Sequence, residues 1–182
     1  MFLACGAFCI IAAQGNVGST KNAITTQRQP VKPARPFVLR KGQSLDELTR
    51  RLGTNSTEEL TGGAGAQLRV AVQRDDDKAA GEAEVHDRAD DVYYILEGKA
   101  TLMLGGTLDA PREISPGEWR SKTVTGNQTI EVAKGDLIIV PRGTPHRRST
   151  QGRAFSMILI KVFADSLPAA ATSDAKRKRQ TP

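Results

Sequence analysis

The sequence predicts an all-β protein built as an antiparallel sandwich or barrel, and three observations support this. After Gln67, apolar residues recur at every second position or in short runs bounded by Gly, Pro and Asp, which is typical of strands. No helical period interrupts this stretch. The 182 residues include 17 Gly and 9 Pro but only 5 Phe, 2 Tyr and 1 Trp, a composition that favours many turns and short elements.

Composition divides the chain into five segments. Polar residues and prolines fill residues 16–36 without a hydrophobic period, and a basic stretch rich in Ala, Ser and Thr closes the chain. Such stretches are typical of linkers and disordered tails. The predicted organisation is a signal peptide at 1–15, a linker or arm at 16–36, a short helix and loop at 37–65, a barrel at 66–164 and a basic disordered tail at 165–182.

The apolar leader bears on where the protein works. Residues 2–13 are apolar and are followed by small residues at which a signal peptidase could cut, which favours a secreted or periplasmic protein. No Lys or Arg precedes this run, so a cytoplasmic protein is the alternative. Both cysteines, Cys5 and Cys9, lie in the leader, which excludes a disulfide framework or a cysteine metal site from the rest of the chain.

One short helix is predicted before the strands, over residues 45–52. Ser44 and Glu47 match a capping box, and leucines recur at helical spacing from Leu45 onwards. Residues 53–65 are rich in Gly and Thr and are predicted to form a loop. Strands are predicted at 68–73, 82–86, 92–96, 100–104, 129–132, 137–140 and 155–163.

The formal charge of +6 is not a signal for nucleic acid. Residues 176–179 alone supply four positive charges, whereas the stretch 66–164 carries fourteen basic and fourteen acidic residues. A basic run in a polar tail is typical of a solvated end. No uninterrupted apolar run reaches the roughly 20 residues of a membrane-spanning helix, so neither a nucleic-acid partner nor a membrane span is predicted.

The chain has only two histidines, and the first, His86, ends an alternating strand. Because successive side chains of a strand point to opposite faces, Glu82, Glu84 and His86 share one face. By the same alternation, Asp91 and Tyr93 share a face of the next strand with apolar residues. A face that mixes ionisable and apolar side chains indicates a lined cavity.

The second histidine, His146, follows a run that begins at Gly135 and continues as an apolar, buried strand. Pro141 and Gly143 then make a sharp corner that fixes where His146 points. This run resembles the second motif of the cupin family, which is Gly, five residues, Pro, one residue, Gly, two residues and His, and all four positions match.

The first cupin motif is matched in part. Gly81 opens it, His86 stands near the usual histidine, and six residues separate Asp91 from Gly98 at the strand end. The resemblance covers roughly residues 68–162. Between the two motifs, the segment Gly105-Gly106-Thr107-Leu108 resembles the one found in a subgroup of small, often exported bacterial cupins.

Three positions depart from the family pattern. Where cupins usually have His-x-His, this chain has either Glu84-x-His86 or His86-x-Arg88, according to how the gap is placed. Asp91 replaces the usual Glu, and Thr150 replaces the closing Asn.

The resemblance implies a double-stranded β-helix, or jelly roll, with a metal ion inside the barrel. Typical members hold that ion with three His and one Glu, so His86, Asp91 and His146 are the matching ligand candidates, and Glu84 is a fourth if its side chain points inward. Two imidazoles and a carboxylate are a ligand set suited to Fe(II), Mn(II) or Zn(II). Tyr93 and Arg88 are the candidates for contacting a small-molecule ligand.

Three functions stay open at this point. The first is a barrel that binds a metal ion and a small-molecule ligand or substrate, as in a metal-dependent oxygenase or isomerase. The second is a metal-free barrel that binds a small ligand without catalysis. The third is a structural protein whose barrel is filled by side chains and which forms a homodimer. The sequence does not decide whether the protein is an enzyme, because one fold hosts many chemistries.

Overall fold

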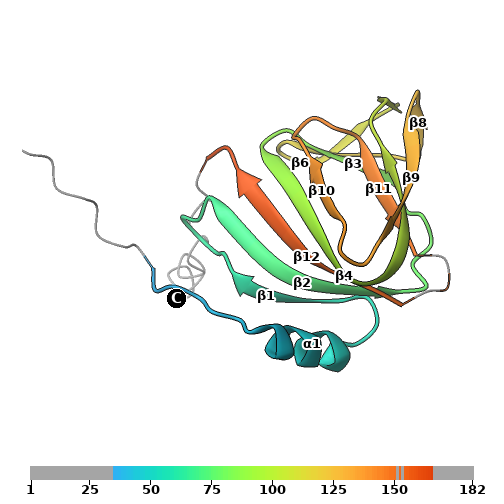
Figure 1. The fold of residues 1–182 in the computed structure, drawn as a ribbon. Coiled ribbons are helices and arrows are strands. Elements are labelled where there is room, and N and C mark those ends of the chain that lie inside the picture. Colours follow the sequence, from blue (N-terminus) through green and yellow to red (C-terminus); the bar gives the residue numbers. More distant parts are fainter. Residues whose placement is uncertain (1–34, 151, 153, 166–182) are drawn as a thin grey trace, which may run out of the picture. The chain divides into compact units, whose positions relative to one another are not determined.

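The computed structural model describes residues 35–150, 152 and 154–165, and a compact unit begins at Phe37. Within that unit one helix precedes an antiparallel β-barrel made of two facing sheets (Figure 1). The predicted signal peptide, nearly all of the linker and nearly all of the basic tail lie outside the described residues. The elements are α1 (Gly42–Arg51), β1 (Ser56–Thr61), β2 (Leu68–Asp76), β3 (Ala83–His86), β4 (Ala89–Leu104), β5 (Thr107–Asp109), β6 (Arg112–Ser115), β7 (Glu118–Ser121), β8 (Thr123–Thr125), β9 (Gln128–Ala133), β10 (Leu137–Val140), β11 (His146–Ser149) and β12 (Ala154–Phe163).

The long strand β4 belongs to both sheets and joins them. Its first half pairs with β12 and β10, and β2 and β1 follow beyond β12. Its second half pairs with β9 and β11, and β3, β7 and β6 follow beyond β11. The sequence predicted two strands, 92–96 and 100–104, where the structure has this single strand. The all-β jelly-roll prediction is confirmed.

The strand changes sheets at Gly98, which has a φ of 78°. A Cβ atom there would collide with the carbonyl oxygen of Ala154 on β12. Only glycine fits both the backbone conformation and the close approach. The core cluster lies between the sheets on both sides of this corner and consists of Tyr93, Ile95, Ala100, Leu102, Val132, Val140, Phe155 and Met157.

The helix differs from its prediction at the start. It begins at Gly42, its N-cap is Lys41, and no side chain caps it, so the capping box predicted from Ser44 and Glu47 is wrong. Both residues lie inside the helix, because apolar contact between Leu48 and the sheet sets the helix position rather than the local capping pattern.

The predicted loop at 53–65 is also wrong in its middle, where β1 pairs with β2 over Ser56–Thr61. A polar strand of this kind has little hydrophobic alternation to reveal it in the sequence. It forms because its backbone hydrogen-bonds to a neighbouring strand. The short strands between residues 107 and 125, and β11, escaped prediction for the same reason. No helix in the described part of the chain is both long and apolar enough to cross a membrane.

Gly98→Ala tests the sheet corner. We expect a loss of at least about 3 kcal/mol in the free energy of unfolding, measured by urea denaturation, because strain in the backbone adds to a collision with the backbone of β12. Gly105→Ala is the matched control, since its φ is 75° and nothing lies within 4 Å of the added Cβ. The control should lose only about 1 kcal/mol, and equal losses would contradict this account of the corner.

Candidate metal and ligand site

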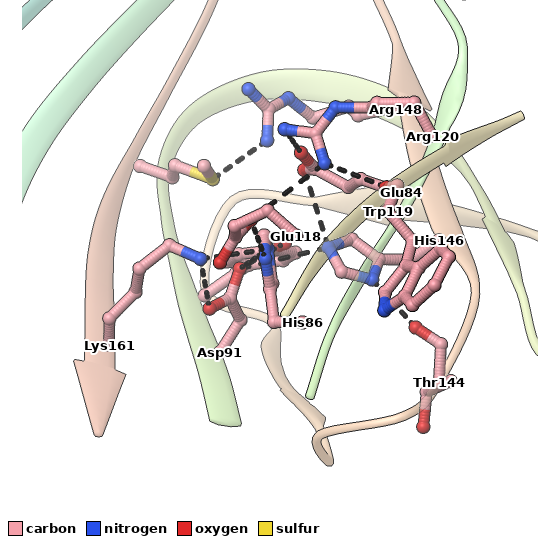
Figure 2. A network of polar contacts seen from close by, with 12 residues as sticks. Glu84, His86, Asp91, Glu118, Trp119, Arg120, Thr144, His146, Arg148 and Lys161 are labelled. Carbon is pink, nitrogen blue, oxygen red and sulfur yellow. Dashed lines mark hydrogen bonds and ion pairs between the residues drawn. The ribbon is translucent and has the colours of Figure 1, made fainter. Parts of the chain in front are cut away.

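A cavity of about 510 Å³ opens into the interior of the barrel. This volume lies in the range of roughly 300 to 1,000 Å³ that is usual for small-molecule sites. Side chains from six strands, β2, β3, β4, β7, β11 and β12, line it, and Figure 2 shows the polar contacts among those at its centre. The hypothesis of a purely structural protein requires a barrel filled by side chains, and this cavity contradicts it.

The two histidines meet in this cavity although they lie sixty positions apart in the chain. Their ring centroids lie 5.2 Å apart, and both side chains are buried. The strand register explains the meeting, because His146 on β11 stands directly opposite Glu84 on β3, two residues before His86. The sequence predicted this convergence from the two motifs, and the structure shows it.

The loop that precedes His146 is bound to the first motif by hydrogen bonds. The backbone N–H of Gly143 donates to the carbonyl oxygen of His86 at 2.8 Å. Arg142 donates to Asp90 through its backbone and its guanidinium, at 2.8 to 3.0 Å. Asp90 therefore anchors the loop, and Asp91 is left to face the cavity.

Each histidine is held through its Nδ1 atom. Nδ1 of His86 lies 2.5 Å from a carboxylate oxygen of Glu118, and Nδ1 of His146 lies 2.9 Å from the carbonyl oxygen of Thr144. Both partners are acceptors, so in the neutral rings Nδ1 carries the proton and Nε2 presents its lone pair. Outer partners of this kind orient metal-binding histidines.

The Asp91 carboxylate lies between the two rings. Its Oδ2 atom is 3.6 Å from Nε2 of His86 and 3.7 Å from Nε2 of His146, and it accepts a hydrogen bond of 3.0 Å from the Tyr93 hydroxyl. Its Oδ1 atom forms an ion pair of 2.8 Å with the ammonium of Lys161. Asp91 thus contacts four polar groups from four strands.

Glu84 points inward on the other side of His146. Its Oε1 atom lies 3.3 Å from Nε2 of His146, and its Oε2 atom lies 2.8 Å from the guanidinium of Arg120. One ligand atom from each of Glu84, His86 and His146 can be chosen so that all three lie within 4.8 Å of one another. The sequence made Glu84 a ligand candidate only if its side chain pointed inward, and in the structure it does.

These spacings fit a single metal ion. Ligand atoms about 2.1 Å from an ion lie about 3.0 to 3.4 Å from each other in octahedral and tetrahedral sites, close to the 3.3, 3.6 and 3.7 Å found here. Nε2 of His146 is also buried without a hydrogen bond among the described residues, because Glu84 lies outside hydrogen-bonding geometry. A buried nitrogen with a free lone pair is the donor that an ion would use.

Lys161 on β12 is the residue that the sequence reasoning missed. Its ammonium lies 2.8 Å from Nε2 of His86, and the register places it directly opposite Asp91. The signal was a single lysine within an apolar strand, two residues after Leu159 and four after Met157, and therefore on the same inward face as these two. Glu118 and Arg120 on β7 were missed as well, because that strand has no apolar alternation to reveal it.

Electrostatic interactions in the cavity favour a cation beside the carboxylates. Burial raises the pKa of Glu84, but contact with His146 and the charges of His86 and Arg120 outweigh burial and lower that pKa to about 2. Burial also raises the pKa of Asp91, and His86 with Lys161 lowers it below its usual value. Burial and the charges of Asp91 and Glu84 raise the pKa of Tyr93, which stays a hydrogen-bond donor.

Of the two residues predicted to contact a small-molecule ligand, Tyr93 lines the cavity and Arg88 does not. Tyr93 is buried and lines the cavity beside Asp91. Arg88 does not reach the cavity; it is exposed and forms an ion pair with Asp165. Arg120 and Arg148 line the wall instead, and Arg148 is held by the buried carboxylate of Asp75.

The barrel has known structural relatives. Protein BH2720 of Bacillus halodurans superposes with a TM-score of 0.51 at 19% identity, over 75% of this chain and 88% of that chain. With the strand topology and the second motif in place, this likeness decides the fold. The fold is that of the cupins.

Two structures described as cupins also match this cupin barrel. A cupin superfamily protein of Desulfitobacterium hafniense, DSY2733, has a TM-score of 0.42 at 18% identity, over 74% of this chain and 96% of that chain. The Cnp3 cupin domain of Schizosaccharomyces pombe has a TM-score of 0.45 at 14% identity, over 63% and 70%. No protein-family model and no curated protein sequence matches the chain. At these identities the likeness extends to the fold alone.

Asp91→Asn tests how far the buried ion pair between Asp91 and Lys161 stabilises the barrel. We expect a loss of about 3 to 5 kcal/mol in the free energy of unfolding, because the buried ammonium of Lys161 loses its charged partner. The double variant Asp91→Asn with Lys161→Met should recover at least half of that loss, as measured by chemical denaturation. Additive losses would show that the two groups do not depend on each other.

Proposed function

We propose that this cupin holds one divalent first-row metal ion between Glu84, His86, Asp91 and His146 and binds a small molecule in the remaining cavity. The observation that carries the proposal is the pair of buried Nε2 atoms with a carboxylate oxygen 3.6 and 3.7 Å from them. Nitrogen and oxygen ligands of this kind favour Fe(II), Mn(II) or Zn(II) over soft metals. Such an ion would supply Lewis acidity toward a substrate oxygen, the chemistry that oxygenases and isomerases use.

The chain's own residues would keep this centre in place. Glu118 and the Thr144 carbonyl fix both ring orientations, and Arg120 holds the second oxygen of Glu84. The Tyr93 hydroxyl donates to Asp91 and stays protonated, which keeps the carboxylate ionised and directed at the rings. With these supports the two rings and the carboxylates would keep their orientations when an ion enters.

The cavity wall indicates the class of small molecule. Basic side chains outnumber acidic ones among the lining residues outside the four proposed ligands, and they sit beside an apolar wall. We infer that the ligand carries an anionic group together with an apolar part. The basic lining residues are Arg69, Lys78, Arg120, Arg147, Arg148 and Lys161, the acidic ones are Glu82 and Glu118, and the apolar wall includes Leu102, Met157, Leu159 and Phe163.

One observation favours a second function, a metal-free cupin that binds its ligand directly. The Lys161 ammonium already contacts Nε2 of His86 and Oδ1 of Asp91, and so supplies a positive charge at the centre. A lone pair on Nε2 cannot serve the ammonium and a metal ion at once. Metal binding therefore requires Lys161 to release His86, while its ion pair with the outer oxygen of Asp91 can persist.

Metal analysis tests the proposed function. Protein incubated with Fe(II), Mn(II) or Zn(II) and then desalted should retain about one equivalent of ion, measured by plasma mass spectrometry, and His146→Ala should lose it. Glu82→Gln is the control, because Glu82 also lines the cavity just before β3 but pairs with Arg112 and is not a proposed ligand. An unchanged, ion-free protein that still binds small anions would leave only the metal-free function.

Lys161→Met tests the competition within the centre. We expect this variant to bind Zn(II) at least about tenfold more tightly than the natural chain, in titrations against a coloured chelator, because the ion no longer displaces an ammonium. Lys78→Met is the matched control, since Lys78 also lines the cavity but pairs with Asp75. An equal gain in affinity in both variants would show that only the overall positive charge of the cavity matters, and not the contact between Lys161 and His86.

A further inference from the structure

A second, smaller pocket lies between helix α1 and the place where β12 pairs with β4. Its volume is about 280 Å³, just below the range of roughly 300 to 1,000 Å³ that is usual for drug-sized ligands. The pocket is lined by Asp46, Thr49 and Arg50 of the helix, Leu96 and Glu97 of β4, Ser156 of β12 and Lys134 in the turn after β9. We call it the helix pocket.

The helix pocket is separate from the barrel cavity. The two share no lining residue. Ser156 in the helix pocket precedes Met157 in the barrel cavity, and successive side chains of a strand point to opposite faces of its sheet. A ligand of the helix pocket would therefore bind independently of the proposed metal site.

Two buried hydroxyls at the helix pocket have no hydrogen-bond partner among the described residues. Thr49 is 5% exposed and Ser156 is 1% exposed, and both hydroxyl oxygens are unpaired. A buried hydroxyl without a partner costs free energy and is uncommon in folded proteins. The carbonyl oxygen of Thr49 accepts a hydrogen bond of 3.0 Å from Arg74 on β2, which holds this turn of the helix on the sheet. Both hydroxyls are therefore fixed in place and available to a molecule in the pocket.

Four charged side chains surround the two hydroxyls. The helix contributes Asp46 and Arg50, and the sheet side contributes Glu97 and Lys134, so each wall has one carboxylate and one cation. All four residues are exposed. Within the part of the chain that the structure describes, none of these side chains has an ion-pair or hydrogen-bond partner. The helix pocket thus combines two unpaired negative and two unpaired positive groups.

This balance of charges favours a zwitterion over a simple ion. An anion would lie beside two carboxylates and a cation beside two basic groups, whereas an ammonium and a carboxylate in one molecule can each face an opposite charge. A hydroxyl both donates and accepts hydrogen bonds, so Thr49 and Ser156 can accept from the ammonium and donate to the carboxylate. Leu96 is the one apolar lining residue and leaves room for a small apolar group only.

We propose that the helix pocket binds a free amino acid with a small side chain. The hydroxyls of Thr49 and Ser156 bind its backbone groups, and the charged side chains of both walls neutralise its ammonium and carboxylate. Because Thr49 belongs to α1 and Ser156 to β12, the bound amino acid also connects the helix to the sheet.

Nuclear magnetic resonance of the full chain locates the ligand. We expect alanine to shift the backbone amide signals of residues 46–50, 96–97 and 156 in a saturable way, with a dissociation constant of about 1 mM or lower, which a ligand of this size can reach. Propionate and ethylamine each lack one of the two charged groups of alanine and should bind at least about tenfold more weakly. No saturable shift with alanine, shifts confined to the barrel cavity, or equal affinity for the singly charged compounds would each overturn the proposal.

Two variants test the unpaired hydroxyls. Thr49→Val and Ser156→Ala each remove one hydroxyl with little change in shape, and each should weaken alanine binding at least about tenfold. Without alanine, the urea midpoint of both variants should stay the same or rise, because an unpaired buried hydroxyl is removed. Ser149→Ala is the matched control, since Ser149 is also buried but donates to the carbonyl oxygen of Lys78.

The control should show the opposite pattern. Its urea midpoint should fall, because the carbonyl oxygen of Lys78 loses a donor, and its affinity for alanine should match that of the natural chain. If Thr49→Val and Ser156→Ala bind alanine as tightly as Ser149→Ala does, the two hydroxyls do not contact the ligand and the proposal is wrong.

Discussion

The interior of this barrel depends on the buried carboxylate of Asp91. It accepts a hydrogen bond from Tyr93, forms an ion pair with Lys161 and lies between His86 and His146. A buried charge is costly unless it is paired and hydrogen-bonded, and here the partners come from different strands. The closed barrel therefore has to place β3, β4, β11 and β12 correctly for one carboxylate to be satisfied, and that requirement links the scaffold to the site.

Two carboxylates in the cavity, those of Glu84 and Asp91, both require a positive charge nearby. The ionised Glu84 and Asp91 favour a positive charge beside them, and the structure supplies it with the ammonium of Lys161. A proton on His86 or the proposed metal ion would compete with this ammonium for the same lone pair and the same carboxylates. Burial and the charge of Lys161 oppose protonation of His86, but contact with Asp91 and the charge of Glu84 together outweigh them, so the pKa of His86 lies above its ordinary value. A site that carries its own ammonium can keep its carboxylates satisfied with or without an ion. In this respect the centre differs from one built only from metal ligands.

The two faces of the first sheet serve different purposes because side chains alternate along each strand. On β12, Lys161 and Leu159 point into the cavity, while Ile158 and Ile160 lie on the opposite face of the sheet. One strand thus supplies a charged group to the cavity and an apolar row to the opposite face of the sheet. Since both depend on the same register, a slip of one residue would expose the ammonium side and bury the wrong row.

The sequence by itself determined the jelly-roll class, the inward direction of Asp91 and Tyr93, and the pairing of His86 with His146, because period-two alternation and the glycine and proline positions of the second motif are local properties of the chain. It did not determine the position of β1, the start of α1 or the presence of Lys161 in the site. Those were decided by strand pairing and helix packing between residues far apart in the chain, such as Lys161 opposite Asp91. No local pattern encodes which strand lies next to another, since that choice follows from closing the barrel around its core.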